Sequence, residues 1–132
     1  MNKEVKKGNI DISKLTVPPS KSELKVAHYF SGLGKDITFI RPSAIPNIHS
    51  PDIIMDGVEW EIKCPVGDGK RTIHNCLIKA VKQSHNVIID LRHMRSSEVK
   101  ATEQLEYEFR LIGKLKRLYI IKKNNEYLLF EK

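Results

Sequence analysis

Residues 50–65 read SPDIIMDGVEWEIKCP, and this stretch decides the fold that the sequence predicts. Its centre is Asp56-Gly57, a dipeptide that stands between two short segments rich in apolar residues. A two-residue Asp-Gly connection between such segments is a strong signal for a β-hairpin. If the turn has two residues, Met55 pairs with Val58, and every further pair follows outward from these two.

This register predicts two carboxylates at one place on the hairpin. Counting outward from the turn, Asp52 stands opposite Glu61. Because side chains alternate between the two faces of a strand, Lys63 shares a face with both. The other face is apolar throughout and is expected to be core: Ile53, Met55, Val58, Trp60, Ile62 and Cys64. Directly opposed like charges destabilise a hairpin, so the pair predicts a bound cation.

The chemistry of such a cation would suit a nuclease. Hard divalent ions such as Mg²⁺ or Mn²⁺ prefer carboxylate oxygens, here those of Asp52 and Glu61. The bound ion would polarise a phosphate and activate a water. Lys63 would orient that water or offset charge on the phosphorane. The alternative is a solvated strand face with ordinary charges.

The segments around the hairpin predict an α/β fold. Ser20 to Glu23 fits a capping box at the start of a helix. The elements expected in chain order are a helix over 20–33, strands over 36–41, 52–55 and 58–64, a helix over 72–85, a strand over 86–92, a helix over 97–113, and strands over 118–122 and 127–130. This order predicts a mixed sheet flanked by helices.

Length and composition predict one globular domain. The chain has 132 residues, of which 40% are hydrophobic and 30% charged, a balance typical of folded proteins. Residues 1–19 are polar and end in Pro18-Pro19, so we expect a tail or arm there and a single domain over 20–132. No apolar run reaches the roughly 20 residues of a membrane helix, and no secretory signal is visible. We therefore expect no membrane partner and a cytoplasmic site of action.

Net charge and motif together indicate a nucleic-acid enzyme. The formal net charge is +7, and a basic surface attracts phosphate backbones. Pro51-Asp52 followed by Glu61-Ile62-Lys63 resembles the PD-(D/E)xK nuclease motif, and the expected αβββαβ order, extended by a C-terminal helix and hairpin, resembles the core of that superfamily. The stretch from Glu23 to about His93 also resembles the C-terminal tRNA nuclease domains of CdiA contact-dependent growth inhibition toxins.

The resemblance adds two candidate site residues. In the resembled domains a glutamate of the first helix joins the acidic cluster. Glu23 would take this place, and it lies in line with the helix stripe that should face the sheet. Its alternative role is the capping box alone. Gln83 resembles the glutamine that some of these nucleases place near the metal, and its alternative is a surface glutamine.

Four cationic residues are candidate phosphate contacts. Lys70 and Arg71 precede a predicted helix, and helix N-termini bind anions. Lys79 and Lys82 are expected on a basic flank that would hold a phosphate backbone without reading sequence. Ordinary solvated side chains are the alternative for all four.

We therefore expect a Mg²⁺-dependent endonuclease (Mn²⁺ serving equally) that cleaves RNA, with tRNA as the favoured substrate. One alternative is a DNA endonuclease of the restriction or recombination type. Another is a nucleic-acid-binding module without activity. A toxin of the resembled kind would also need an immunity or inhibitor protein as a partner, and it would be delivered as part of a larger toxin.

Overall fold

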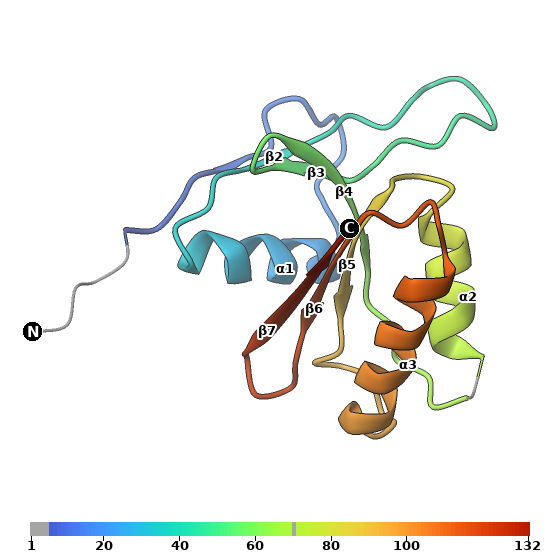
Figure 1. Cartoon of the computed structure of the whole chain (residues 1–132). Helices are drawn as coiled ribbons and strands as arrows, with labels where there is room; N and C mark the ends of the chain where they lie inside the picture. The colour runs from blue at the N-terminus through green and yellow to red at the C-terminus, as the bar shows by residue number, and fades with distance from the viewer. Residues whose placement is uncertain (1–5, 70) are drawn as a thin grey trace, which may run out of the picture. The chain divides into compact units, whose positions relative to one another are not determined.

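The computed structural model describes residues 6–69 and 71–132 (Figure 1). Contacts within the chain divide it into two compact units, Met1–Trp60 and Glu61–Lys132. Strand β4 (Val58–Lys63) runs through the boundary, so its first half belongs to one unit and its second half to the other. The α/β class is confirmed, because both units combine helices with paired strands. The predicted division into a tail over 1–19 and a single domain over 20–132 stays a prediction.

The first unit holds one helix and a small mixed set of strands. Its elements are β1 (Ile10–Asp11), α1 (Lys21–Gly32), β2 (Ile37–Phe39), β3 (Ile53–Met55) and the first half of β4. β1 pairs with β2 in parallel, and β2, β3 and β4 pair antiparallel in that order. Strand β1 was not predicted. It lies in the stretch expected to be a tail, where the N–H of Gly8 donates to the carbonyl of Ser31 at 2.9 Å.

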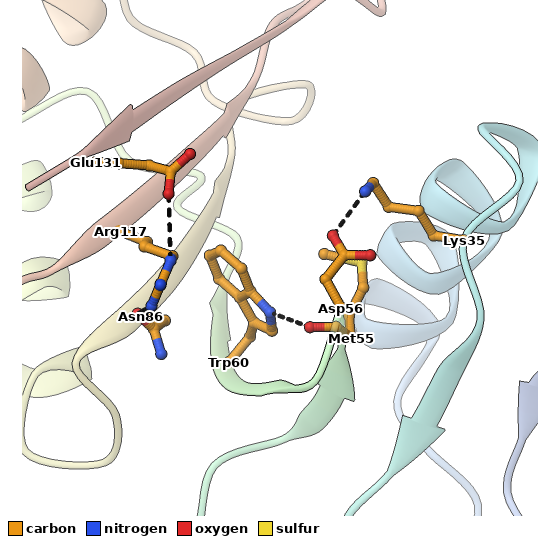
Figure 2. Close-up of polar contacts among 7 residues, drawn as sticks. All are labelled: Lys35, Met55, Asp56, Trp60, Asn86, Arg117 and Glu131. Atoms are coloured by element: carbon orange, nitrogen blue, oxygen red, sulfur yellow. Dashed lines mark hydrogen bonds and ion pairs between the residues drawn. The ribbon is translucent and has the colours of Figure 1, made fainter.

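The hairpin turn has the predicted length and register. Met55 pairs with Val58, and the two following pairs outward keep step. Asp56 and Gly57 have φ values of 55° and 76°, the left-handed pair that a two-residue hairpin turn requires. Figure 2 shows two contacts that fix the turn: Trp60 Nε1 donates to the carbonyl of Met55 at 2.9 Å, and the Lys35 ammonium lies 2.6 Å from the Asp56 carboxylate.

Helix α1 and strands β2 to β4 enclose the core of the first unit. The helix begins at the predicted capping box and buries one stripe, formed by Val26, Ala27 and Phe30. The strands bury residues that the pairing places on one face: Ile37, Phe39, Ile53, Met55 and Trp60. The predicted apolar face of the hairpin is thus core at Ile53, Met55, Trp60 and Ile62, while Val58 and Cys64 are only partly buried. The exposed Glu59 and Ile54 lie on the other face.

The second unit holds two helices and the remaining strands. Its elements are the second half of β4, α2 (Thr72–Ala80), β5 (Asn86–Asp90), α3 (Glu98–Leu111), β6 (Arg117–Ile121) and β7 (Tyr127–Glu131). β4, β5 and β6 pair in parallel, and β7 returns antiparallel to β6. The helix predicted over 72–85 ends at Ala80. A tighter turn follows, in which the N–H of Lys82 bonds the carbonyl of Lys79.

Helices α2 and α3 lie side by side on one face of these strands (Figure 1). The core between helices and strands includes Leu77 of α2, Leu105 of α3, and Val87 and Ile89 of β5. Parallel pairing aligns Glu61 with Val87 and Lys63 with Ile89. Both β4 side chains therefore share the face that the two helices cover. None of the described helices is long and apolar enough to cross a membrane.

Candidate active site

Glu61 and Lys63 form an ion pair on strand β4. Glu61 is only 3% exposed, and the Lys63 ammonium lies 3.4 Å from its Oε2 atom. The two residues share a face because they are two positions apart on one strand. A carboxylate buried this deeply needs charged or hydrogen-bonding partners, and the lysine is one of them.

Gln83 is the second partner of Glu61. With its amide nitrogen turned toward the carboxylate, Gln83 donates to both oxygens, at 2.9 Å to Oε1 and in closer contact with Oε2. The turn after α2 holds the residue in place, since its backbone N–H donates to the carbonyl of Ala80 at 2.9 Å. The structure therefore brings together three of the residues singled out in the sequence, and Gln83 is half-buried.

The surroundings of Lys63 include helix α2. Burial raises the pKa of the Cys76 thiol, while the nearby cations of Lys63 and Lys79 act in the opposite direction. Cys76 is a free, partly buried thiol of α2, and Lys63 is one of the cations near it.

Asp52 lies one residue before strand β3. Its N–H donates to the carbonyl of Trp60 at 2.9 Å, and its own carbonyl accepts from the N–H of Ile40 at 2.9 Å. Because Ile53 is also the ladder partner of Trp60, two residues of one strand stand opposite one of the next. The one-to-one register therefore ends at the Ile53–Trp60 pair. The prediction that placed Asp52 opposite Glu61 had extended it by one further pair. Such bulges bend a strand and re-aim a side chain, and they are common beside active sites.

Glu23 makes both bonds of the capping box. Its N–H donates to Ser20 Oγ at 3.1 Å, and its Oε1 accepts from the N–H of Ser20 at 3.0 Å. Glu23 also lines a pocket of about 420 Å³ in the first unit, and Asp52 lines the same pocket. The structure thus brings these two predicted carboxylates to one pocket, while the helix cap engages one of them.

The same pocket contains a residue that the sequence did not single out. Arg41 follows strand β2 and lines the pocket together with the segment Thr16–Pro19 and with Pro42. It is a cation beside two carboxylates. An arginine at the end of a predicted strand and directly before a proline was the available signal.

The carboxylates fit a hard cation by their chemistry. Within residues 6–69 and 71–132, no three His, Cys, Asp or Glu side chains gather closely enough to form a metal cluster. Mg²⁺ usually takes only one or two carboxylates and keeps several waters, so it does not require such a cluster. Glu23 and Asp52, which line one pocket of the first unit, are two such oxygen donors, and Glu61 is a buried carboxylate of the second unit.

The predicted phosphate contacts lie at opposite ends of α2. Lys79 and Lys82 are exposed near the C-terminal end, close in sequence to Gln83. Arg71 is the N-cap residue at the other end and is also exposed. Lys70 lies outside the described residues. Among the three described residues of this set, the two lysines lie at the same end of the helix as Gln83.

Comparison with known proteins gives a family and a fold. Residues 49–127 match the family model described as "Contact-dependent growth inhibition CdiA C-terminal domain". The structure is similar to a chain of the solved "CdiA-CT/CdiI toxin and immunity complex from Burkholderia pseudomallei", with a TM-score of 0.67 and 17% identity over 95% of this chain and 100% of that chain. At this identity the likeness concerns the fold alone. No curated protein matches the sequence significantly.

Proposed function

Because this chain belongs to the family of contact-dependent growth inhibition CdiA C-terminal domains, we propose that it is a toxin domain acting as a metal-dependent nuclease on RNA, with tRNA as its substrate. The observation that carries the proposal is the contact of Glu61 with both Lys63 and Gln83. A buried carboxylate held by a lysine two residues later is the ExK half of the PD-(D/E)xK motif. Membership of that nuclease superfamily is part of the proposal.

Asp52 supplies the other half of the motif. It follows Pro51, and its N–H is anchored to the carbonyl of Trp60, the residue directly before Glu61. We propose that Asp52 and Glu61 hold one Mg²⁺ or Mn²⁺ ion, which when bound would polarise the scissile phosphate and activate a water. Glu23 lines the same pocket as Asp52 and would complete the acidic set. It would bind through Oε2, because its Oε1 accepts the hydrogen bond of the helix cap.

Lys63 and Gln83 have separate roles in this proposal. The lysine ammonium offsets the negative charge that develops on the phosphorane and orients the attacking water. Gln83 is a positioning residue, because its amide holds the carboxylate of Glu61 in a fixed orientation. The exposed Lys79 and Lys82 contact the phosphate backbone of the substrate without reading its bases.

The partner and place of action follow from the family. The solved structure with the similar fold is described as a toxin and immunity complex, and we infer that this chain also has a cognate immunity protein. A nuclease that acts on tRNA must reach the cytoplasm of the cell it inhibits. The net charge of +7 supports a polyanionic substrate there.

A substrate panel tests the proposal. The protein is incubated with total tRNA, ribosomal RNA and duplex DNA, each with Mg²⁺ and with EDTA. We expect discrete fragments of tRNA that EDTA abolishes. Intact tRNA beside cut duplex DNA would replace the RNA nuclease with a DNA endonuclease. Binding of nucleic acid without cleavage of any would identify an inactive binding module instead.

A further inference from the structure

A second hollow, of about 390 Å³, lies between helices α2 and α3 of the second unit. Its lining residues are Arg71, His74, Gln104, Tyr107 and Glu108. The volume falls within the range of small-ligand pockets. The hollow is separate from the cluster of Glu61, Lys63 and Gln83. The rise along α2 places His74 roughly 9 Å from Ala80, and Gln83 follows Ala80 in the chain.

A buried carboxylate orients the histidine of this hollow. Glu108 is only 7% exposed, and its Oε1 is in close contact with Nδ1 of His74. Its Oε2 accepts from Nε2 of Gln104 at 3.5 Å. The other ring nitrogen of His74 lies on the far side of the ring from Glu108, and the side chain is 49% exposed. The contact at Nδ1 therefore leaves Nε2 to meet a ligand.

Two exposed side chains complete the lining. Arg71 stands at the start of α2, where no side chain caps the helix. Tyr107 is 62% exposed and lies about one turn of α3 after Gln104, since the two are three residues apart. A guanidinium suits a phosphate, and so does His74 in its imidazolium form, in which Nδ1 donates to Glu108 and Nε2 donates to the ligand. An exposed phenol ring suits a base.

We propose that this hollow binds one nucleotide of a single-stranded RNA segment, with the phosphate between Arg71 and His74 and the base stacked on Tyr107. The inference rests on the proposed function, because it assumes a nucleic-acid substrate, and it adds an anchoring site away from the acidic cluster. If His74 served only to neutralise the buried Glu108, neither Arg71 nor Tyr107 would affect RNA binding.

Fluorescence anisotropy with a labelled single-stranded RNA oligonucleotide in EDTA tests the site without cleavage. Tyr107→Ala and Arg71→Ala should each weaken binding about tenfold, the scale of losing one stacked base or one charge-assisted phosphate contact. Tyr107→Phe keeps the ring and should bind as the wild type does. Binding of duplex DNA should not respond to Tyr107→Ala, because paired bases cannot stack on the ring.

Two matched controls remove the same groups elsewhere on the second unit. Tyr127 is 46% exposed on β7, and Arg110 is exposed on α3, where it pairs with Glu106. Tyr127→Ala and Arg110→Ala should change RNA affinity less than twofold. Equal losses in the controls, or wild-type affinity in Tyr107→Ala, would overturn the site. If RNA affinity falls in Tyr107→Ala while the wild type cleaves no nucleic acid, the binding site stands and the nuclease proposal fails.

Discussion

The backbone N–H of Asp52 donates to the carbonyl of Trp60, the residue that immediately precedes Glu61. The bond attaches the Pro-Asp end of one strand to the residue directly before the Glu-x-Lys segment of the next. It also makes a bulge, because Asp52 and Ile53 both stand opposite Trp60. The following predictions test what this arrangement and the neighbouring contacts do.

The first prediction concerns Asp52 as a metal ligand. Asp52→Asn keeps the shape of the side chain and the backbone bonds but removes the charge, so Mn²⁺ binding measured by calorimetry should weaken at least tenfold. Asp56→Asn is the control, because Asp56 lies at the exposed turn of the same hairpin and contacts Lys35. Equal Mn²⁺ affinity in both variants would remove Asp52 from the metal site.

The second prediction separates the two roles of Glu23. Glutamine can replace glutamate in a capping box, so Glu23→Gln should keep the melting temperature while cleavage falls at least tenfold. Ser20→Ala removes the cap and should cost about 1 kcal/mol of stability while cleavage persists. Full cleavage by Glu23→Gln would leave Glu23 with the cap as its function.

The third prediction concerns Lys63. Lys63→Met keeps most of the aliphatic stem and should lower the cleavage rate about a hundredfold or more, the scale of removing one group that stabilises transition-state charge. The affinity for uncleaved tRNA in EDTA should stay within a few-fold of the wild type. Lys79→Met serves as the comparison, because it removes one contact to the phosphate backbone of the substrate. It should weaken tRNA binding, while bound tRNA is still cleaved at the wild-type rate.

The fourth prediction concerns Gln83 as a positioning residue. Gln83→Leu leaves Glu61 without its amide donor, so the Mg²⁺ concentration for half-maximal cleavage should rise roughly 10- to 100-fold, as is typical when a ligand loses its supporting hydrogen bond. Excess Mg²⁺ should restore much of the rate. A purely structural role would lower the melting temperature and leave the Mg²⁺ dependence as it was.

The local signals of the hairpin predicted the strand pairing, the core face and the shared face of Glu61 and Lys63. The Asp56-Gly57 turn determined the register as far as the Ile53–Trp60 pair, and period-2 alternation correctly placed the core face. The bulge at Asp52 was not predictable, because a strand pattern carries no mark of where two residues will share one partner. Strand β1 was missed for a related reason: Ile10–Asp11 is too short to show alternation.

One member of a buried helix stripe was not predictable from the sequence. On α3 the buried residues are Ala101, Leu105, Glu108 and Phe109. Glu108 continues the helical spacing from Ala101 and Leu105. A carboxylate is nevertheless predicted to be exposed unless its partner is known. That partner is His74, which is distant in the chain. The contact of Gln83 with Glu61 is equally a product of tertiary packing.

The measurement that tests the central claim most directly is single-turnover cleavage of tRNA by the wild type and by Glu61→Gln, in Mg²⁺ and after addition of EDTA. Glutamine keeps the size of the buried side chain and can still accept from Gln83, so circular dichroism should show an unchanged fold. The account predicts Mg²⁺-dependent fragments from the wild type and at least a thousandfold slower cleavage by the variant. Cleavage of tRNA by a folded Glu61→Gln protein at the wild-type rate, or in EDTA, would contradict it.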